Sequence, residues 1–202
     1  MKKSDIALAI GMAAALLVGN FNAFAGKCEK LEDSILRLHI IANSDSRQDQ
    51  EVKLEIRDAI LEEFSEKLDG KNLDEAITLA SENLNGIEET ANRILAERGF
   101  DYRTDAKLTS MYFNTRYYDN YTTPAGQYTA VRITLGEGAG KNWWCVLYPS
   151  LCLGTAVDDE CAQTFDGFDN KTAQKPEYVA KFKVIELFES AKDFLNGIFK
   201  NT

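Results

Sequence analysis

The chain has 202 residues, of which 45% are apolar and 27% charged, and its formal net charge is −9. This length and balance fit one globular domain with a substantial core and exclude a disordered or collagen-like chain. Nucleic-acid binding needs clustered lysine and arginine side chains that displace counterions, and no basic run follows Lys3. With one histidine and four scattered cysteines, we expect no zinc site of cysteine and histidine ligands, and no other metal or cofactor.

The amino terminus has the pattern of a secretory signal peptide. Two lysines precede an apolar run from Ile6 to Val18, which is shorter than the roughly 20 residues that span a bilayer. Ala23-Phe24-Ala25 then forms an A-x-A cleavage motif. We therefore expect residues 1–25 to be removed and residues 26–202 to form a single secreted domain. An uncleaved anchor is the alternative, because no charge separates the apolar run from the cleavage motif.

Export affects how the four cysteines are interpreted, because an even number in an exported chain permits two disulfides in three connectivities. They are Cys28, Cys145, Cys152 and Cys161. Cys145 and Cys152 are seven residues apart, with Pro149 between them, so a chain reversal would bring their Cα atoms within the roughly 4.4–6.8 Å that a disulfide requires. We predict this pair, with both thiols buried and reduced as the alternative.

The first half of the chain predicts a strand followed by two helices. Residues 35–42 predict the strand, because apolar side chains alternate with Arg37 and His39. A helix follows to about residue 68. Apolar residues at alternating spacings of four and three then predict a second helix that ends at Gly99.

The second half is mostly strand. Alternating apolar residues predict strands at 108–118, 128–135 and 143–148, and an amphipathic helix begins at Pro176. The predicted fold class is therefore α+β, with a mainly antiparallel sheet of about four strands packed by two long helices and a C-terminal helix.

The glycine-rich segment 136–141 resembles a phosphate-binding loop only superficially. Leu135 and Asn142 stand where a P-loop needs glycine and serine or threonine. A strand, and no helix, follows the segment, so a dinucleotide site is not expected either. We interpret it as a hairpin loop whose glycines adopt positive φ.

A nucleophile and base could be drawn from His39 with Cys145 or Ser44, which would make the chain an exported hydrolase. No nucleophile elbow accompanies these residues, and a lone histidine on a strand is more often structural. We keep this hydrolase as the alternative function.

Two segments are more specific than these patterns. One is His39-Ile40-Ile41-Ala42-Asn43-Ser44-Asp45-Ser46, followed by Asp49-Gln50 and Lys53. The other begins at Pro124-Ala125-Gly126, continues through Tyr128 and Arg132 and ends in the block Gly136–Pro149, which contains Trp143-Trp144-Cys145, with Cys152 after it. Together they resemble the stage II sporulation protein R family over roughly residues 34–155. The departures are Thr123, where an aromatic or aliphatic residue is expected, and Ser150, where a second proline is usual.

The resemblance implies a secreted signalling protein of endospore-forming bacteria that is not an enzyme. Members of the family are made in the forespore and exported into the space between the forespore and mother-cell membranes. There they trigger a membrane-embedded aspartic protease, which cleaves the pro-form of a sporulation sigma factor. The expected partner is thus the extracytoplasmic part of that protease, with no nucleic acid and no small-molecule substrate.

We expect partner contacts at the turn after the first strand and at the tryptophan pair. The candidate residues are His39, Asn43, Ser44, Asp45, Trp143 and Trp144. The alternative for the turn is that Ser44, Asp45 or Ser46 only caps the helix that follows. For the tryptophans, strand alternation predicts that one lies in the core and that the other is exposed or lies under a helix.

Overall fold

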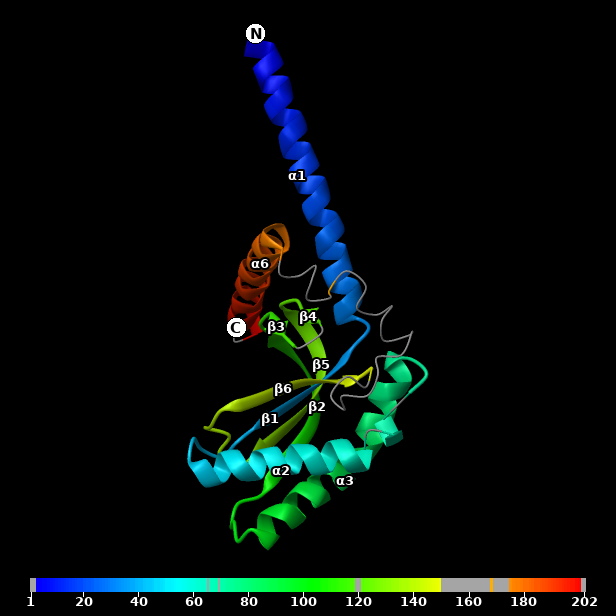
Figure 1. Ribbon diagram of the computed structural model, residues 1–202, viewed down its shortest axis with the longest axis vertical. Helices are drawn as coiled ribbons and strands as arrows, with labels where there is room; N and C mark the ends of the chain where they lie inside the picture. The colour runs from blue at the N-terminus through cyan, green and yellow to red at the C-terminus, as the bar shows by residue number, and fades with distance from the viewer. Residues whose placement is uncertain are drawn as a thin grey trace. The chain divides into compact units, whose positions relative to one another are not determined.

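The computed structural model describes residues 3–64, 66–68, 70–118, 121–149, 168 and 175–200 (Figure 1). Contacts divide the chain into two compact units, which are described separately. Unit 1 comprises residues 1–32, 112–126 and 165–202, and unit 2 comprises residues 33–111 and 127–164.

A four-stranded sheet organises unit 2, with strand order β2-β5-β1-β6. The strands are β1 (Leu36–Ile41), β2 (Thr104–Phe113), β5 (Gly126–Leu135) and β6 (Asn142–Tyr148). The sheet is mainly antiparallel, and β1 pairs antiparallel with β6 but parallel with β5. Parallel neighbours need a long crossover, and the two helices between β1 and β2 lie within that crossover. The predicted α+β fold class is confirmed.

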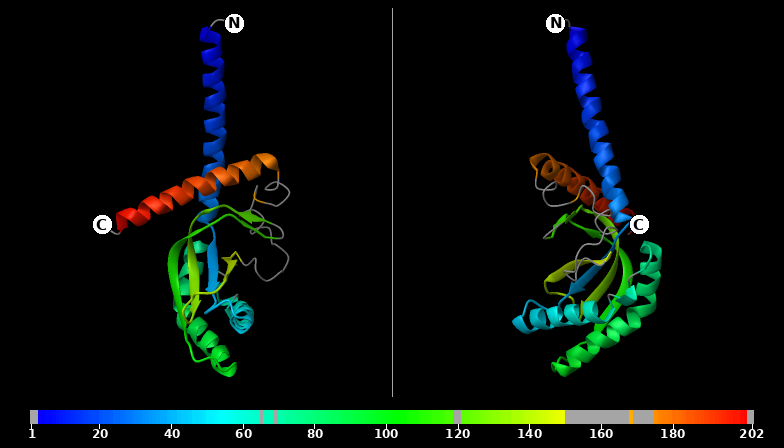
Figure 2. Two further views of the ribbon diagram at one scale, coloured as in Figure 1. Left: turned by 90° about the vertical axis from the view of Figure 1, so that its left-hand side faces the viewer. Right: turned by 45° about the vertical axis from the view of Figure 1, so that its right-hand side comes forward.

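The helices of unit 2 are α2 (Arg47–Phe64), the short η1 (Glu66–Leu68) and α3 (Leu73–Glu97). Helices α2 and α3 lie against each other (Figure 2). Their apolar sides share one buried cluster with the sheet face that carries Leu38, Val131 and Leu147. Burial of this face is the main stabilising contribution in unit 2.

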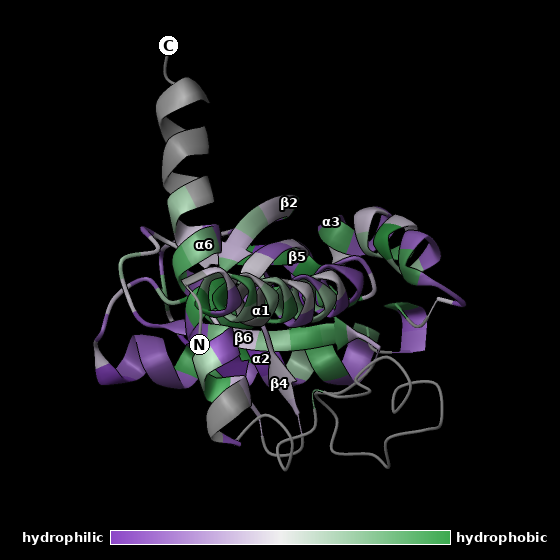
Figure 3. Cartoon of the chain, turned by 90° about the horizontal axis from the view of Figure 1, so that it is seen from above, coloured by the Kyte–Doolittle hydropathy of each residue, from purple (hydrophilic) through white to green (hydrophobic). Residues whose placement is uncertain are grey.

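The ends of α3 follow from its sequence. Asn72 accepts a hydrogen bond from the N–H of Glu75 at 2.9 Å, and the Glu75 carboxylate accepts one from the N–H of Lys71 at 2.8 Å. This is a reciprocal capping box. Gly99, at φ +79°, ends the helix in the left-handed conformation that glycine favours. Hydrophobic and hydrophilic residues mix along α3 in Figure 3, as in a helix with one buried side.

Unit 1 contains α1 (Lys3–Glu32), the short pair β3 (Arg116–Tyr117) and β4 (Thr122–Thr123), and α6 (Pro176–Lys200). The Phe24 ring lies 5.2 Å from that of Phe182, in an edge-to-face arrangement. In the described part of the chain, no helix is both long and apolar enough to span a membrane. The predicted boundary after residue 25 falls within α1, and cleavage there stays a prediction.

Candidate functional site

The turn after β1 caps α2. The Ser46 hydroxyl accepts a hydrogen bond from the N–H of Asp49 at 3.1 Å, and the backbone carbonyl of Ser46 accepts one from the N–H of Gln50 at 3.0 Å. The Ser44 hydroxyl accepts a hydrogen bond from the N–H of Ser46 at 3.1 Å. Part of the motif therefore has the capping role that its serines suggested.

Asn43 connects this turn to the glycine-rich loop between β5 and β6. Its side-chain oxygen accepts a hydrogen bond from the N–H of Glu137 at 3.0 Å, and its amide nitrogen donates to Asp49 at 3.2 Å. Gly136 has φ +54°, and a Cβ there would lie 2.3 Å from the Asn43 oxygen. Glycine at this position lets the loop approach Asn43 closely. Positive φ at Gly136 and Gly138 is confirmed, but the predicted hairpin is wrong, because β1 lies between β5 and β6 in the sheet.

Asp45 and Gly140 make the second connection between the two loops. The Asp45 carboxylate accepts a hydrogen bond from the N–H of Lys141 at 2.8 Å, and the N–H of Gly140 donates to the carbonyl of Ala42 at 2.9 Å. A Cβ on Gly140 would lie 2.2 Å from the carbonyl oxygen of Ser44. We call residues 43–48 and 136–142 the paired-loop surface. Its exposed members are Asp45, Ser46, Arg47, Gln48, Glu137, Ala139, Lys141 and Asn142.

Asp49 is almost fully buried and holds the paired-loop surface through hydrogen bonds to its side chains. Its carboxylate accepts hydrogen bonds from Asn43, from the Ser44 hydroxyl and from the Tyr102 hydroxyl, the last at 2.5 Å. Burial opposes ionisation of Asp49, but the hydrogen bonds outweigh it, so its pKa lies below the ordinary value. Burial and the neighbouring Asp49 raise the pKa of Tyr102. The carboxylate is therefore the charged centre of a hydrogen-bond network.

Lys53 supports the glycine-rich loop and is only 4% exposed. Its ammonium donates hydrogen bonds to Gln50 Oε1 at 2.7 Å and to the carbonyl of Lys141 at 3.0 Å. Burial lowers the pKa of Lys53. Gln50 in turn donates to the carbonyl of Ser44 at 2.9 Å. The Asp49-Gln50 and Lys53 part of the motif thus holds both loops in place.

His39 lies on the sheet face opposite the α2–α3 core. It is 3% exposed, its Nε2 lies 2.8 Å from Oδ1 of Asn142, and its ring stacks on Trp144 with centroids 3.9 Å apart. Cys145 pairs with Leu38 in the core cluster, so it faces the other side of the sheet. The structure therefore does not bring His39 and Cys145 together.

The two tryptophans lie on opposite faces of β6, and each is half-buried. Trp143 packs against the core cluster, and the Arg57 guanidinium of α2 lies 4.3 Å from its ring centroid. Trp144 stacks on His39 instead. Strand alternation predicted the opposite faces correctly, but neither ring is fully exposed and neither is fully buried.

Cys145 is disulfide-bonded, and its partner lies outside the described residues. The pairing with Cys152 stays a prediction because residues 150–167 are not described. Cys28 is a buried free thiol, and burial raises its pKa to about 12. Within the described ranges, no group of three histidine, cysteine or carboxylate side chains is placed to hold a metal ion.

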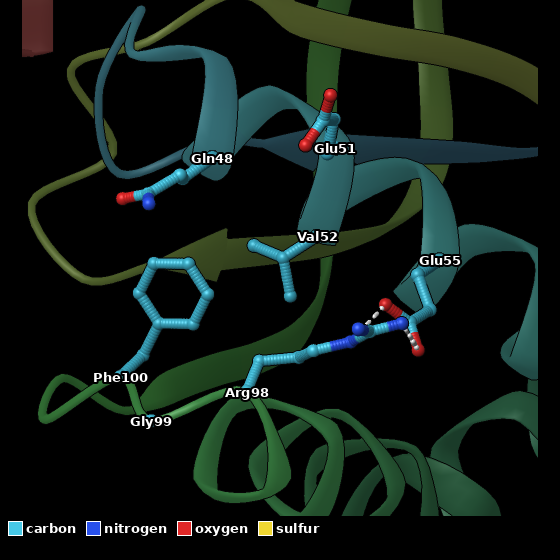
Figure 4. Close-up of a pocket in the computed structure, with 7 residues that line it drawn as sticks. All are labelled: Gln48, Glu51, Val52, Glu55, Arg98, Gly99 and Phe100. Atoms are coloured by element: carbon cyan, nitrogen blue, oxygen red, sulfur yellow. Dashed lines mark hydrogen bonds and ion pairs between the residues drawn. The ribbon is translucent and has the colours of Figure 1, made fainter.

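Sequence reasoning missed Tyr102 and a pocket beside the paired-loop surface. The pocket has a volume of about 500 Å³. It is lined by Gln48, Glu51, Val52, Glu55, Arg98, Gly99 and Phe100, as Figure 4 shows. Arg98 donates two hydrogen bonds to Glu55 across it, at 2.9 and 3.0 Å. No local pattern marks these residues, because α2 and the end of α3 meet only in the folded chain.

Comparison with known proteins supplies independent evidence. A family model described as stage II sporulation protein R matches residues 32–158. The stage II sporulation protein R of Bacillus subtilis (strain 168) is 40% identical over 136 residues, which is 64% of this chain and 61% of that relative. The match therefore covers less than two thirds of the relative's length. No solved structure matches the chain.

Proposed function

Because the chain belongs to the stage II sporulation protein R family, we propose that it is a secreted signalling protein that triggers a membrane-embedded aspartic protease. The protease then cleaves a pro-sigma factor, and the chain itself catalyses no reaction. It acts in the space between the forespore and mother-cell membranes. Family membership gives the role in sporulation, and the finer steps are our proposal.

The observation that carries the proposal is the construction of the paired-loop surface. The hydrogen bonds of the motif residues Asn43, Asp49 and Lys53 hold the turn after β1 and the loop before β6 in place. None of these bonds positions a reacting group. A rigid polar surface held by buried groups is what a protein ligand needs, since preorganisation lowers the entropic cost of binding.

The exposed chemistry of this surface fits a protein partner. It presents Asp45 and Glu137 beside Arg47 and Lys141, so both signs of charge are interspersed. Such a surface offers directional hydrogen bonds and charge complementarity, which favour specific association. Nucleic acid would instead require a continuous basic surface.

The hydrolase alternative receives no support from the described residues. A sulfur in a disulfide cannot act as a thiolate nucleophile, which removes Cys145 in its bonded state. The Ser44 hydroxyl donates to Asp49, and the described contacts of His39 are with Asn142 and Trp144. No nucleophile–base pair is therefore assembled from these candidates.

A binding experiment tests the proposal. The full chain and the extracytoplasmic part of the protease are mixed, and the affinity is measured for the native chain, for Lys141→Glu and for Lys107→Glu. Lys107 is an exposed lysine on β2, outside both paired loops in sequence, and serves as the matched control. We expect Lys141→Glu to weaken binding and Lys107→Glu to leave it unchanged. If the two substitutions change the affinity equally, the paired-loop surface is not the contact with the protease.

Export is tested separately by sequencing the amino terminus of protein released from the cell. Cleavage after Ala25 predicts a chain that starts at Gly26. A membrane-retained product that starts at Met1 would contradict the secreted form. Cleavage would also remove Phe24 from its contact with Phe182, so the melting temperature of the released protein should be measured alongside.

A further inference from the structure

Helix α6 exposes a stripe of apolar side chains. The stripe consists of Val184, Leu187, Phe188 and Ala191, and we call it the outer stripe of α6. Leu187 is 73% exposed and Phe188 is 59% exposed. Spacings of three and four residues place the four side chains on one side of the helix. Exposed side chains of this size at helical spacing form an apolar patch of the kind that marks an interaction site.

The outer stripe is not the side that α6 uses within unit 1. Phe182 and Ile185 are buried, and the Phe182 ring packs 5.2 Å from Phe24 and 6.2 Å from Phe168. Packing of the unit is therefore satisfied by a different side of the helix. The outer stripe remains on the surface after that packing is complete.

The four charged residues of α6 whose side chains the structure describes are arranged around the outer stripe by sign. At about 100° per residue, Lys183 falls just beyond one border of the stripe and Lys181 just beyond the other, whereas Glu186 and Glu189 fall on the opposite side. The Lys181 ammonium lies 4.9 Å from the ring centroid of Tyr178 and 5.6 Å from that of Phe24, and docking on lipid would draw it away from these rings. Lys183 pairs with Glu186 at 3.2 Å. Such exposed pairs contribute little stability, so this lysine can exchange its partner at low cost.

We propose that the outer stripe of α6 docks on the surface of a phospholipid bilayer that contains anionic headgroups. Helices with this pattern lie in the interface, with the apolar side in the acyl boundary and lysines reaching the phosphates. Lysines near the surface also gain electrostatic attraction to anionic lipid. The sequence continues the same spacing at Leu195 and Ile198. This inference does not depend on the proposed protease contact.

The lysine borders favour lipid over a second copy of the chain. Two α6 helices that met through their outer stripes would bring Lys181 and Lys183 of one copy towards lysines at the borders of the other. Like charges at the edges of a helix pair are unfavourable. A bilayer with anionic headgroups places phosphates at both borders instead.

Hydrogen–deuterium exchange of the full chain, with and without vesicles of phosphatidylglycerol and phosphatidylethanolamine, tests the proposal. Peptide-level analysis separates α6 from α1, which has exposed apolar residues of its own. We expect vesicles to slow exchange in α6 peptides. The double change Leu187→Glu with Phe188→Glu should abolish that slowing. Leu54→Glu makes the same chemical change at an exposed leucine of α2 and should preserve it.

Exchange in unit 2 peptides checks that each variant remains folded. If vesicles leave α6 exchange unchanged in the native chain, the proposal is wrong. It is also wrong if α6 exchange slows with rising protein concentration when no vesicles are present, since that would assign the outer stripe to self-association. Equal vesicle protection in the double variant would overturn it as well, because the outer stripe would then not be the contact.

Discussion

The Asp45 carboxylate accepts a hydrogen bond from the backbone N–H of Lys141 at 2.8 Å, although 96 positions separate the two residues. The turn after β1 and the loop before β6 therefore form one structural element. A substitution in either loop should therefore alter the conformation of the other, because a few hydrogen bonds join them.

Replacing Asn43 by alanine should destabilise unit 2 by about 1–3 kcal/mol, because the N–H of Glu137 loses its acceptor and Asp49 loses a donor. Chemical denaturation of the native and variant chains measures this difference. We also expect weaker protease activation at temperatures where the variant is still folded. If the Asn43→Ala variant is destabilised but activates the protease fully, Asn43 has only a structural role.

Replacing Gly140 by alanine should displace the glycine-rich loop, since the new Cβ would lie 2.2 Å from a backbone oxygen of Ser44. Backbone cannot move aside as a flexible side chain can, and overpacking of this kind costs about 1–3 kcal/mol. The neighbouring exposed Ala139→Ser is the control. The chemical shift of the Lys141 amide reports the displacement, and an unshifted signal in the Gly140 variant would show that the loop tolerates the added methyl group.

Stability should depend on pH through Asp49. Its folded-state pKa lies below the ordinary value of about 3.9, so its contribution is fully present above about pH 4. That contribution is lost as pH falls through the folded-state pKa. Asp49→Asn should lower stability at neutral pH and flatten the acid limb of a plot of unfolding free energy against pH. Asp105→Asn makes the same chemical change at an exposed carboxylate of β2 and is the control for the substitution itself.

The cysteines should differ in reactivity. Without reductant, Cys145 should resist alkylation even after unfolding, because it is disulfide-bonded. Cys28 should be protected only in the folded chain, where burial raises its pKa to about 12. Peptide mapping by mass spectrometry measures both and identifies the partner of Cys145. Alkylation of Cys145 in unfolded, unreduced protein would contradict the bond.

Local patterns predicted much of unit 2. Alternation in residues 36–41 identified the two faces of β1, and apolar spacings of four and three identified α3 and its end at Gly99. The predicted strand at 108–118 instead starts at Thr104 and ends at Phe113. Periodicity shows which face is buried but not which strand lies alongside, so the parallel pairing of β1 with β5 was not predicted.

The site could not be predicted in full from the sequence because its contacts join residues far apart in the chain. Tyr102 reaches Asp49 across 53 positions, and Asn43 reaches Glu137 across 94. The motif residues were identified as candidates from the sequence. Their division into exposed groups and buried supports depends on the fold, because the same asparagine or aspartate can occupy either place.

The most direct test of the central claim is a titration of protease activity by the chain. Purified protease in vesicles, its pro-sigma substrate and increasing amounts of the native chain or Lys141→Glu are combined, and the processed product is measured. A ligand that acts by contact predicts processing that saturates as the protease becomes occupied, with Lys141→Glu shifted to higher concentrations. Processing that is independent of the chain, or that proceeds equally with Lys141→Glu, would contradict signalling through the paired-loop surface.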